Sequence, residues 1–169
     1  PHTRGGGESS SEASNSSSST QRSLDPPANG WSCELFFAGA FKAEQKVQRS
    51  SWCDDGARGG VKCYSQGVRG AVFYHHQNRT EPYVNGGKFA CLAPRLPSDL
   101  YLTSRFCLAP SGEGFGDRLA TSMLRGCVPL IIQPGVLQPY DDILPYHKFS
   151  IRVGADKIPI LHKLLPSIT

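Results

Sequence analysis

The chain has 169 residues and a formal net charge of +4, with 18 Lys and Arg against 14 Asp and Glu. The positive charges are spread out and form no basic run, so the composition does not point to a nucleic-acid-binding protein. No stretch approaches the roughly 18 consecutive apolar residues of a membrane-spanning helix. Because the sequence starts at Pro1 rather than at a methionine, we expect it to be a piece of a longer polypeptide.

Residues 1–32 are predicted to form a disordered linker. They are rich in Ser, Gly, Pro and Asn and contain almost no large apolar side chains, so they cannot bury enough surface to offset the entropy of ordering. The remaining residues, 33–169, are long enough to enclose one hydrophobic core and are predicted to be a single domain.

Six cysteines and two N-x-S/T sequons favour an oxidising compartment. The candidate glycosylation sites are Asn15 and Asn78. The cysteine spacings match no zinc-binding template, so no metal site is expected. Cys53 and Cys63 are the candidate disulfide, since a bond between them would close a local loop. The two other cysteines at predicted strand positions, 107 and 127, are compatible either with a disulfide or with buried thiols.

Between residues 34 and 102 the pattern predicts two strands and two helices. The strands cover 34–39 and 89–93, and the helices cover 64–77 and 97–102. Ser98 is the predicted cap of the second helix. Asp54 and Asp55 lie in a polar, Gly-rich stretch and are interpreted as part of a solvated loop, not a metal site. His75 and His76 would point to different faces of their helix and are interpreted as a surface pair.

Residues 104–133 predict a strand, a small-residue loop, a helix and a second strand. These elements cover 106–110, 111–116, 117–125 and 127–132. This is the order of a βαβ unit in a parallel sheet. Glycines in the loop allow a ligand to approach the backbone, and the start of the helix directs free N–H groups and a positive dipole end toward the loop. The stretch therefore predicts an anion-binding turn, for which a nucleotide phosphate is the usual ligand.

The spacing of the glycines in this loop leaves open an alternative to the anion-binding turn. The loop reads G-x-G-x-G, with Asp117 where the third glycine of a dinucleotide-binding motif would fall, so a flexible turn that binds nothing is equally compatible. The same spacing argues against an NAD-dependent oxidoreductase, which also needs an acidic residue at a strand end about 20 residues further on.

The last part of the chain is predicted to hold a helical turn over 139–145, a strand over 150–153 and a closing helix over 156–166. Asp141 and Asp142 lie in the helical turn and are interpreted as capping or solvent-exposed residues. Strands that alternate with helices along the whole domain predict an α/β fold, with a parallel sheet and helices on both of its faces.

Three segments together resemble the exostosin-type glycosyltransferases, glycosyltransferase family 47. They read SRFCLAPSG (104–112), GCVPLIIQ (126–133) and LQPYDDILPYHKFSIRV (137–153). The resemblance runs from about Leu35 to Thr169 and implies the C-terminal half of a GT-B enzyme, a Rossmann-like domain that binds the nucleotide sugar. It implies transfer of a sugar, usually from UDP, to a glycan or glycoprotein acceptor with inversion at the anomeric carbon.

The same resemblance implies that no metal cofactor is required. It also implies a Golgi-lumenal location within a single-pass type II membrane protein. The membrane anchor and the N-terminal half would then lie outside this chain, and the N-terminal half would complete the enzyme.

The resemblance further implies which residues hold the nucleotide sugar. Ser111 and Gly112 match the loop that would face the diphosphate, and Arg118 matches an arginine that would offset the diphosphate charge. Arg69 matches a second arginine of the same role. The full candidate set is Arg69, Ser111, Gly112, Glu113, Gly114, Arg118 and Thr121.

The sequence departs from the family pattern at Thr121, where many members carry a glutamate that could bind the ribose hydroxyls. Inverting transfer also needs a general base, which the resemblance assigns to the N-terminal half, so no catalytic residue is predicted here. The alternative function is therefore a non-catalytic nucleotide-binding or structural module, a truncated or degenerate transferase fragment.

Overall fold

The computed structural model describes residues 30–41, 64–79, 87–112 and 117–168. Several sequence-based predictions lie outside these ranges. They are residues 1–29 of the linker predicted over 1–32, Asn15, Asp54, Asp55, the Cys53–Cys63 bond, Glu113 and Gly114. The last part of that linker is ordered, since Ser32 forms backbone hydrogen bonds with Thr103 and Lys88.

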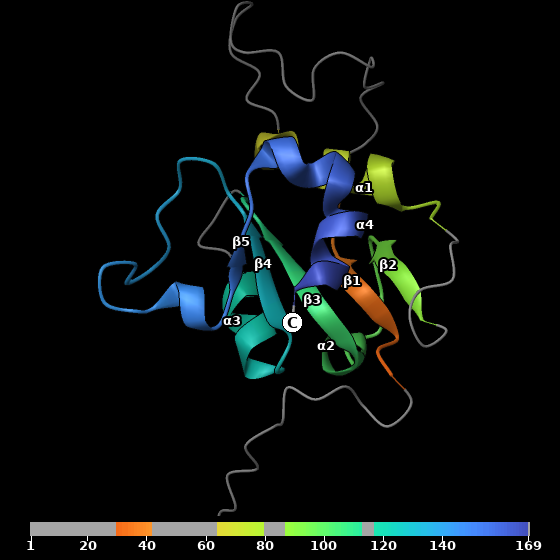
Figure 1. The fold of residues 1–169 in the computed structure, drawn as a ribbon, viewed down its shortest axis with the longest axis horizontal. Helices are drawn as coiled ribbons and strands as arrows, with labels where there is room; N and C mark the ends of the chain where they lie inside the picture. Colours follow the sequence, from red (N-terminus) through yellow and green to blue (C-terminus); the bar gives the residue numbers. More distant parts are fainter. Residues whose placement is uncertain (1–29, 42–63, 80–86, 113–116, 169) are drawn as a thin grey trace, which may run out of the picture.

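The centre of the fold is a parallel sheet of five strands in the order β2-β1-β3-β4-β5 (Figure 1). The strands are β1 (Cys33–Ala38), β2 (Lys88–Ala93), β3 (Ser104–Pro110), β4 (Val128–Ile132) and β5 (Ile151–Arg152). All five coincide with predicted strands, and the predicted α/β class with a parallel sheet is confirmed.

Helices cover both faces of the sheet. The elements are η1 (Tyr64–Gly67), α1 (Val68–His76), α2 (Leu100–Thr103), α3 (Asp117–Leu124), η3 (Tyr146–Lys148), η4 (Ala155–Ile160), α4 (Leu161–Leu164) and η5 (Leu165–Ser167). In Figure 1, α4 lies in front of the sheet and α3 lies behind it. The central strands are therefore buried on both faces, which explains why they read as continuous apolar runs rather than as alternating patterns.

The main hydrophobic core lies between the sheet and the layer formed by α1 and the C-terminal helices. Leu35 and Phe37 of β1 pack there with α1, and Leu161 of α4 is fully buried in the same cluster. On the opposite face, Leu119 of α3 packs against Ala109 of β3. Successive residues of a strand point to opposite faces, so β1 and β3 contribute to both layers.

Two disulfide bonds link neighbouring strands of the sheet. The described part of the chain contains four cysteines, and all are paired, as Cys33–Cys91 and Cys107–Cys127. The second bond settles the alternative that the sequence left open for residues 107 and 127 in favour of a disulfide, which joins β3 to the start of β4.

Two local predictions are wrong, and a third, the closing helix over 156–166, is confirmed only in part. Helix α2 starts at Leu100, so its cap position is Asp99 instead of Ser98, and Asp99 makes no side-chain capping bond. Residues 139–145 form hydrogen-bonded turns, since Tyr140 has a left-handed backbone (φ 59°) that cannot continue a right-handed helix. The closing segment is 3-10 helix over six residues before α4, because Pro159 lacks the N–H that an α-helix interior needs.

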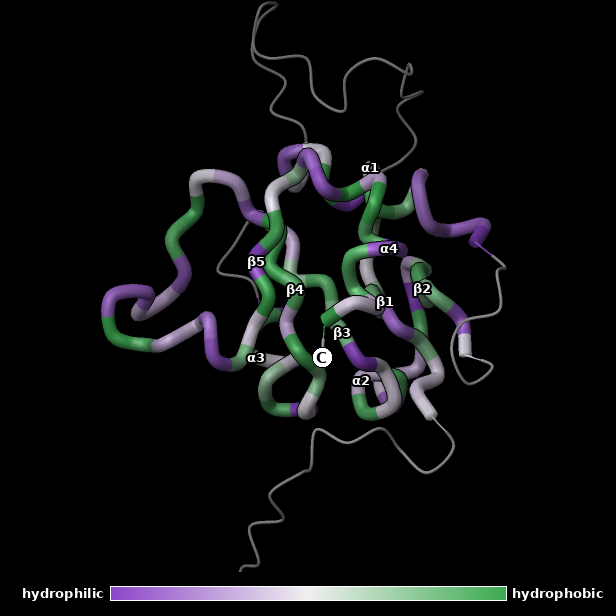
Figure 2. The backbone as a smooth tube through the Cα atoms, viewed as in Figure 1, coloured by the Kyte–Doolittle hydropathy of each residue, from purple (hydrophilic) through white to green (hydrophobic). Residues whose placement is uncertain are grey.

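The loop from β4 to β5 projects beyond the edge of the sheet (Figure 1). Figure 2 shows apolar and polar stretches alternating along it. Leu137 and Ile143 are 85% and 73% exposed there. In the described ranges, no helix is both long and apolar enough to cross a membrane.

Candidate functional site

The strand order creates a switch point between β1 and β3. From β1 the chain crosses to β2 on one side, and β3 then pairs with β1 on the other side. In open parallel sheets, ligands bind at such a point, just beyond the carboxyl ends of the strands. Gly39 follows β1 and Ser111 follows β3, so the predicted anion-binding turn lies at this position.

Two arginines converge on the carboxyl end of β1. The guanidinium carbons of Arg118 and Arg69 lie 4.9 Å and 5.4 Å from the centroid of the Phe37 ring. Arg118 comes from the first turn of α3, and its Nη2 donates to the Ala38 carbonyl at 3.1 Å. A positive guanidinium is attracted to the face of an aromatic ring, so Phe37 helps to hold both side chains beneath the loop after β3.

Arg69 is placed more deeply than Arg118. Only 3% of Arg69 is exposed, and its Nη1 and Nη2 donate to the carbonyls of Ala40 and Ser111, each at 3.3 Å. Arg118, by contrast, is half-buried. Of the two predicted diphosphate arginines, Arg118 is therefore the one that lies nearer to solvent.

Two buried donors at this site lack partners among the described residues. They are Nε of Arg118 and Oγ of Ser111. A buried donor without a hydrogen bond costs about 1–3 kcal/mol, and an oxygen of a bound anion would remove that cost. The arrangement is thus suited to an anionic ligand.

Glycines are required here because the arginines approach the backbone closely. A Cβ at Gly39 would overlap Nη2 of Arg118, and a Cβ at Gly112 would lie 2.9 Å from Nη2 of Arg69. Either side chain would displace a guanidinium that is hydrogen-bonded to the backbone.

The other residues singled out in the sequence differ in their exposure and in their place in the fold. Thr121 is half-buried on α3, one helical turn after Arg118, and Asn78 is exposed just after α1. Asp141 forms an ion pair with Arg152 and accepts a hydrogen bond from the Gln138 N–H at 3.4 Å. The hydrogen bond from Arg152 lowers the pKa of Asp141. Asp141 therefore joins its loop to β5 through Arg152, and it caps no helix, because the residues around it form turns.

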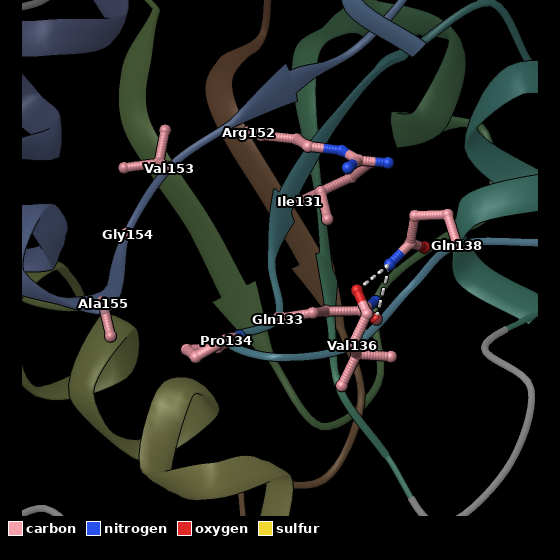
Figure 3. Close-up of a pocket in the computed structure, with 9 residues that line it drawn as sticks. All are labelled: Ile131, Gln133, Pro134, Val136, Gln138, Arg152, Val153, Gly154 and Ala155. Atoms are coloured by element: carbon pink, nitrogen blue, oxygen red, sulfur yellow. Dashed lines mark hydrogen bonds between the residues drawn. The ribbon is translucent and has the colours of Figure 1, made fainter. Parts of the chain in front are cut away.

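A pocket that the sequence did not reveal lies near the β5 edge of the sheet. It has a volume of about 410 Å³ and opens between the carboxyl ends of β4 and β5 (Figure 3). Its lining residues are Ile131, Gln133, Pro134, Val136, Gln138, Arg152, Val153, Gly154 and Ala155. Gln133 donates to the Ala109 carbonyl at 3.0 Å and accepts from Gln138 at 3.0 Å. The side-chain amides of these two glutamines connect the pocket to the end of β3. In the sequence, the pocket is marked only by this pair of glutamines, which flank the Pro134–Gly135 turn.

Comparison with known families identifies the domain. The Exostosin GT47 domain matches residues 14–168 of the chain. The chain belongs to the exostosin GT47 family. The resemblance inferred from three short segments therefore extends over nearly the whole chain, and the parallel sheet is consistent with one Rossmann-like half of a GT-B glycosyltransferase.

Several plant proteins are similar to this chain. "Probable glucuronosyltransferase GUT1" of Oryza sativa subsp. japonica is 34% identical over 146 residues, which are 86% of this chain and 31% of the relative. "Probable glucuronosyltransferase 47 A" of Physcomitrium patens is 26% identical over 88% of this chain and 30% of the relative. "Probable glycosyltransferase At5g03795" of Arabidopsis thaliana is 38% identical over 43% of this chain and 14% of the relative. The chain thus spans less than a third of the length of each of these relatives.

Proposed function

We propose that this chain is the donor-binding part of a glycosyltransferase that uses a nucleotide sugar, linked to UDP, and transfers the sugar with inversion to a glycan or glycoprotein acceptor. The diphosphate lies over the switch point, between the Ser111–Gly112 loop and Arg118. The observation that carries this proposal is the pair of buried donors without partners among the described residues, Arg118 Nε and Ser111 Oγ, at the site where a Rossmann-like sheet binds ligands.

The residues at the switch point can support departure of the nucleoside diphosphate. Negative charge on the diphosphate grows as the bond to the sugar breaks, and a fixed guanidinium stabilises that charge. Arg118 can bind two phosphate oxygens at once, because its donors form a planar fork. The start of α3 adds free N–H groups and a positive dipole end. This set can perform the task without a metal ion, so we propose that none is needed.

The general base that deprotonates the acceptor is proposed to come from the N-terminal half of the same polypeptide. The names of two relatives include glucuronosyltransferase, which makes UDP-glucuronic acid the first donor to test. The cysteine pairs fit an oxidising compartment, and we propose the Golgi lumen, with the chain as part of a type II membrane protein.

Replacing Arg118 by alanine is expected to weaken UDP binding about 30-fold, because a charge-assisted pair of hydrogen bonds contributes about 2 kcal/mol. Arg118→Lys keeps the charge but loses the planar fork, and it should give an intermediate affinity. Isothermal titration calorimetry of the chain with UDP measures both. Lys163→Ala, which removes an exposed positive charge on α4, is the matched control and should bind as the wild type does.

Absence of heat with the wild-type chain would reject nucleotide binding. Equal affinity for the wild type and Arg118→Ala would instead reject the role of this arginine.

Thr121→Glu is expected to tighten UDP binding about tenfold, because a carboxylate one turn after Arg118 can accept hydrogen bonds from the ribose hydroxyls. The gain should vanish with 2′,3′-dideoxy-UDP, which lacks those hydroxyls. Competition calorimetry with the two nucleotides measures the difference. Equal gains for both nucleotides would show that the glutamate does not bind the ribose.

The second candidate function, a non-catalytic nucleotide-binding module, is favoured by the threonine at position 121. Assaying the longest polypeptide that carries this chain against a panel of UDP-sugars separates the two. Transfer to a glycan acceptor identifies an enzyme, whereas UDP binding without turnover identifies a module.

A further inference from the structure

The carbonyl oxygen of Ser111 accepts hydrogen bonds from two buried side chains. Ser65 Oγ donates to it at 2.5 Å, and Arg69 Nη2 donates to it at 3.3 Å. Both donors come from the η1–α1 segment, 46 and 42 residues away in sequence. Only 6% of Ser65 and 3% of Arg69 are exposed. Neither side chain therefore faces solvent directly, and both act on the loop from the protein interior.

Holding this carbonyl also sets the direction of the next N–H group. The Ser111–Gly112 peptide bond is trans and planar, so the Gly112 N–H points opposite to the Ser111 C=O. The carbonyl points inward to Ser65 and Arg69, and the N–H consequently points outward from an exposed residue. Among the described residues, the Gly112 N–H has no hydrogen-bond partner.

Ser65 reaches the carbonyl from an unusual turn. The φ angles of Ser65, Gln66 and Gly67 are 59°, 51° and 75°, so three consecutive residues are left-handed. A left-handed conformation costs about 1–2 kcal/mol for a residue other than glycine. Such backbone persists only where surrounding contacts fix it, and it gathers at functional sites. The Ser65–Ser111 hydrogen bond is one contact that fixes this turn.

We propose that Ser65 and Arg69 are positioning residues that orient the Ser111–Gly112 peptide for the nucleotide diphosphate. We name this pair the Ser65–Arg69 clamp. The inference rests on the proposed function, and it gives Arg69 an indirect role in place of the direct diphosphate contact that the family resemblance implies. The clamp aims the Gly112 N–H at the same anion that Arg118 Nε and Ser111 Oγ bind.

Ser65→Gly tests the clamp, because glycine adopts the left-handed conformation without strain and lacks the side chain that carries the hydroxyl. We expect UDP to bind about five- to tenfold more weakly to this variant, by the loss of one positioning hydrogen bond. Ser65→Ala should show the same loss. The matched control is Ser150→Ala. Ser150 is equally buried, at 6% exposure, but its hydroxyl donates to the Tyr146 carbonyl at 2.7 Å, away from the loop, so the wild-type affinity should remain.

Two measurements separate positioning from general stability. Calorimetry gives the Kd for UDP, and thermal unfolding gives the Tm of each variant. In wild-type protein labelled with ¹⁵N-glycine, UDP should shift the Gly112 amide resonance, and Ser65→Gly should reduce that shift while the protein remains folded. A role in stability alone would lower the Tm and leave the Kd and the resonance shift unchanged, which would overturn the proposal.

The outcome also distinguishes the clamp from the function on which it rests. If Arg118→Ala weakens UDP binding and Ser65→Gly does not, the clamp is wrong and the donor-binding site stands. If the wild-type chain binds no UDP, both fail.

Discussion

Below pH 6.5 the folded protein is expected to lose stability, by about 3 kcal/mol once the pH reaches 4, because of one buried histidine. His76 on α1 is fully buried, so its interpretation as half of a surface pair is wrong. Its Nε2 lies 2.7 Å from the Ile158 carbonyl and must donate to it. Its Nδ1 has no hydrogen-bond partner within the described ranges. The neutral ring therefore suits this position, and a protonated ring does not.

Burial lowers the pKa of His76 from 6.5 to about 4. The positive charges of Arg79, His162 and His75 act in the same direction, and the hydrogen bond to Ile158 opposes them. In the unfolded chain the ring takes up a proton below pH 6.5, whereas in the folded chain it does so only near pH 4. The contribution to stability is therefore complete above pH 6.5 and lost as the pH falls to 4.

Urea unfolding at pH 7.5, 6, 5 and 4 measures this loss. His76→Gln keeps an N–H donor for the Ile158 carbonyl but does not titrate, so its free energy of unfolding should fall less steeply over the same range. Parallel curves for the wild type and His76→Gln would show that other groups cause the acid sensitivity.

Removing the Cys107–Cys127 disulfide is expected to lower the free energy of unfolding by about 3 kcal/mol. The bond closes a loop with a sequence separation of 20 residues, and a closed loop of that length reduces the entropy of the unfolded chain by about this amount. The loop contains the end of β3, the segment after Ser111, and all of α3. The disulfide therefore links β3, which leads into the proposed diphosphate loop at Ser111, to the start of β4.

Denaturant unfolding of the wild type and the double variant Cys107→Ser/Cys127→Ser measures the effect. Both proteins should be compared without reductant, so that Cys33–Cys91 remains intact. Thiol titration of the wild type under denaturing, non-reducing conditions is the control. Reaction of residues 107 and 127 with the thiol reagent would contradict the disulfide itself.

The sequence by itself determined the order of the elements and the place of the predicted anion-binding turn. Apolar runs bounded by Gly and Pro mark β3 and β4, and the periodicity between them marks α3, because each signal comes from residues that are neighbours in the chain. The resemblance of three segments to the exostosin family added Arg118 and Ser111 to the candidate site. Both residues lie at the switch point of the folded sheet.

Tertiary structure decided everything that depends on residues far apart in sequence. Only the strand order β2-β1-β3-β4-β5 brings Gly39 against the guanidinium of Arg118. Only the packing of α1 buries Arg69 and carries Ser65 to the Ser111 carbonyl. The cysteine pairing and the pocket between β4 and β5 likewise follow from strands that meet in space. Local periodicity reports which face of an element is apolar, but it holds no information about which element will cover that face.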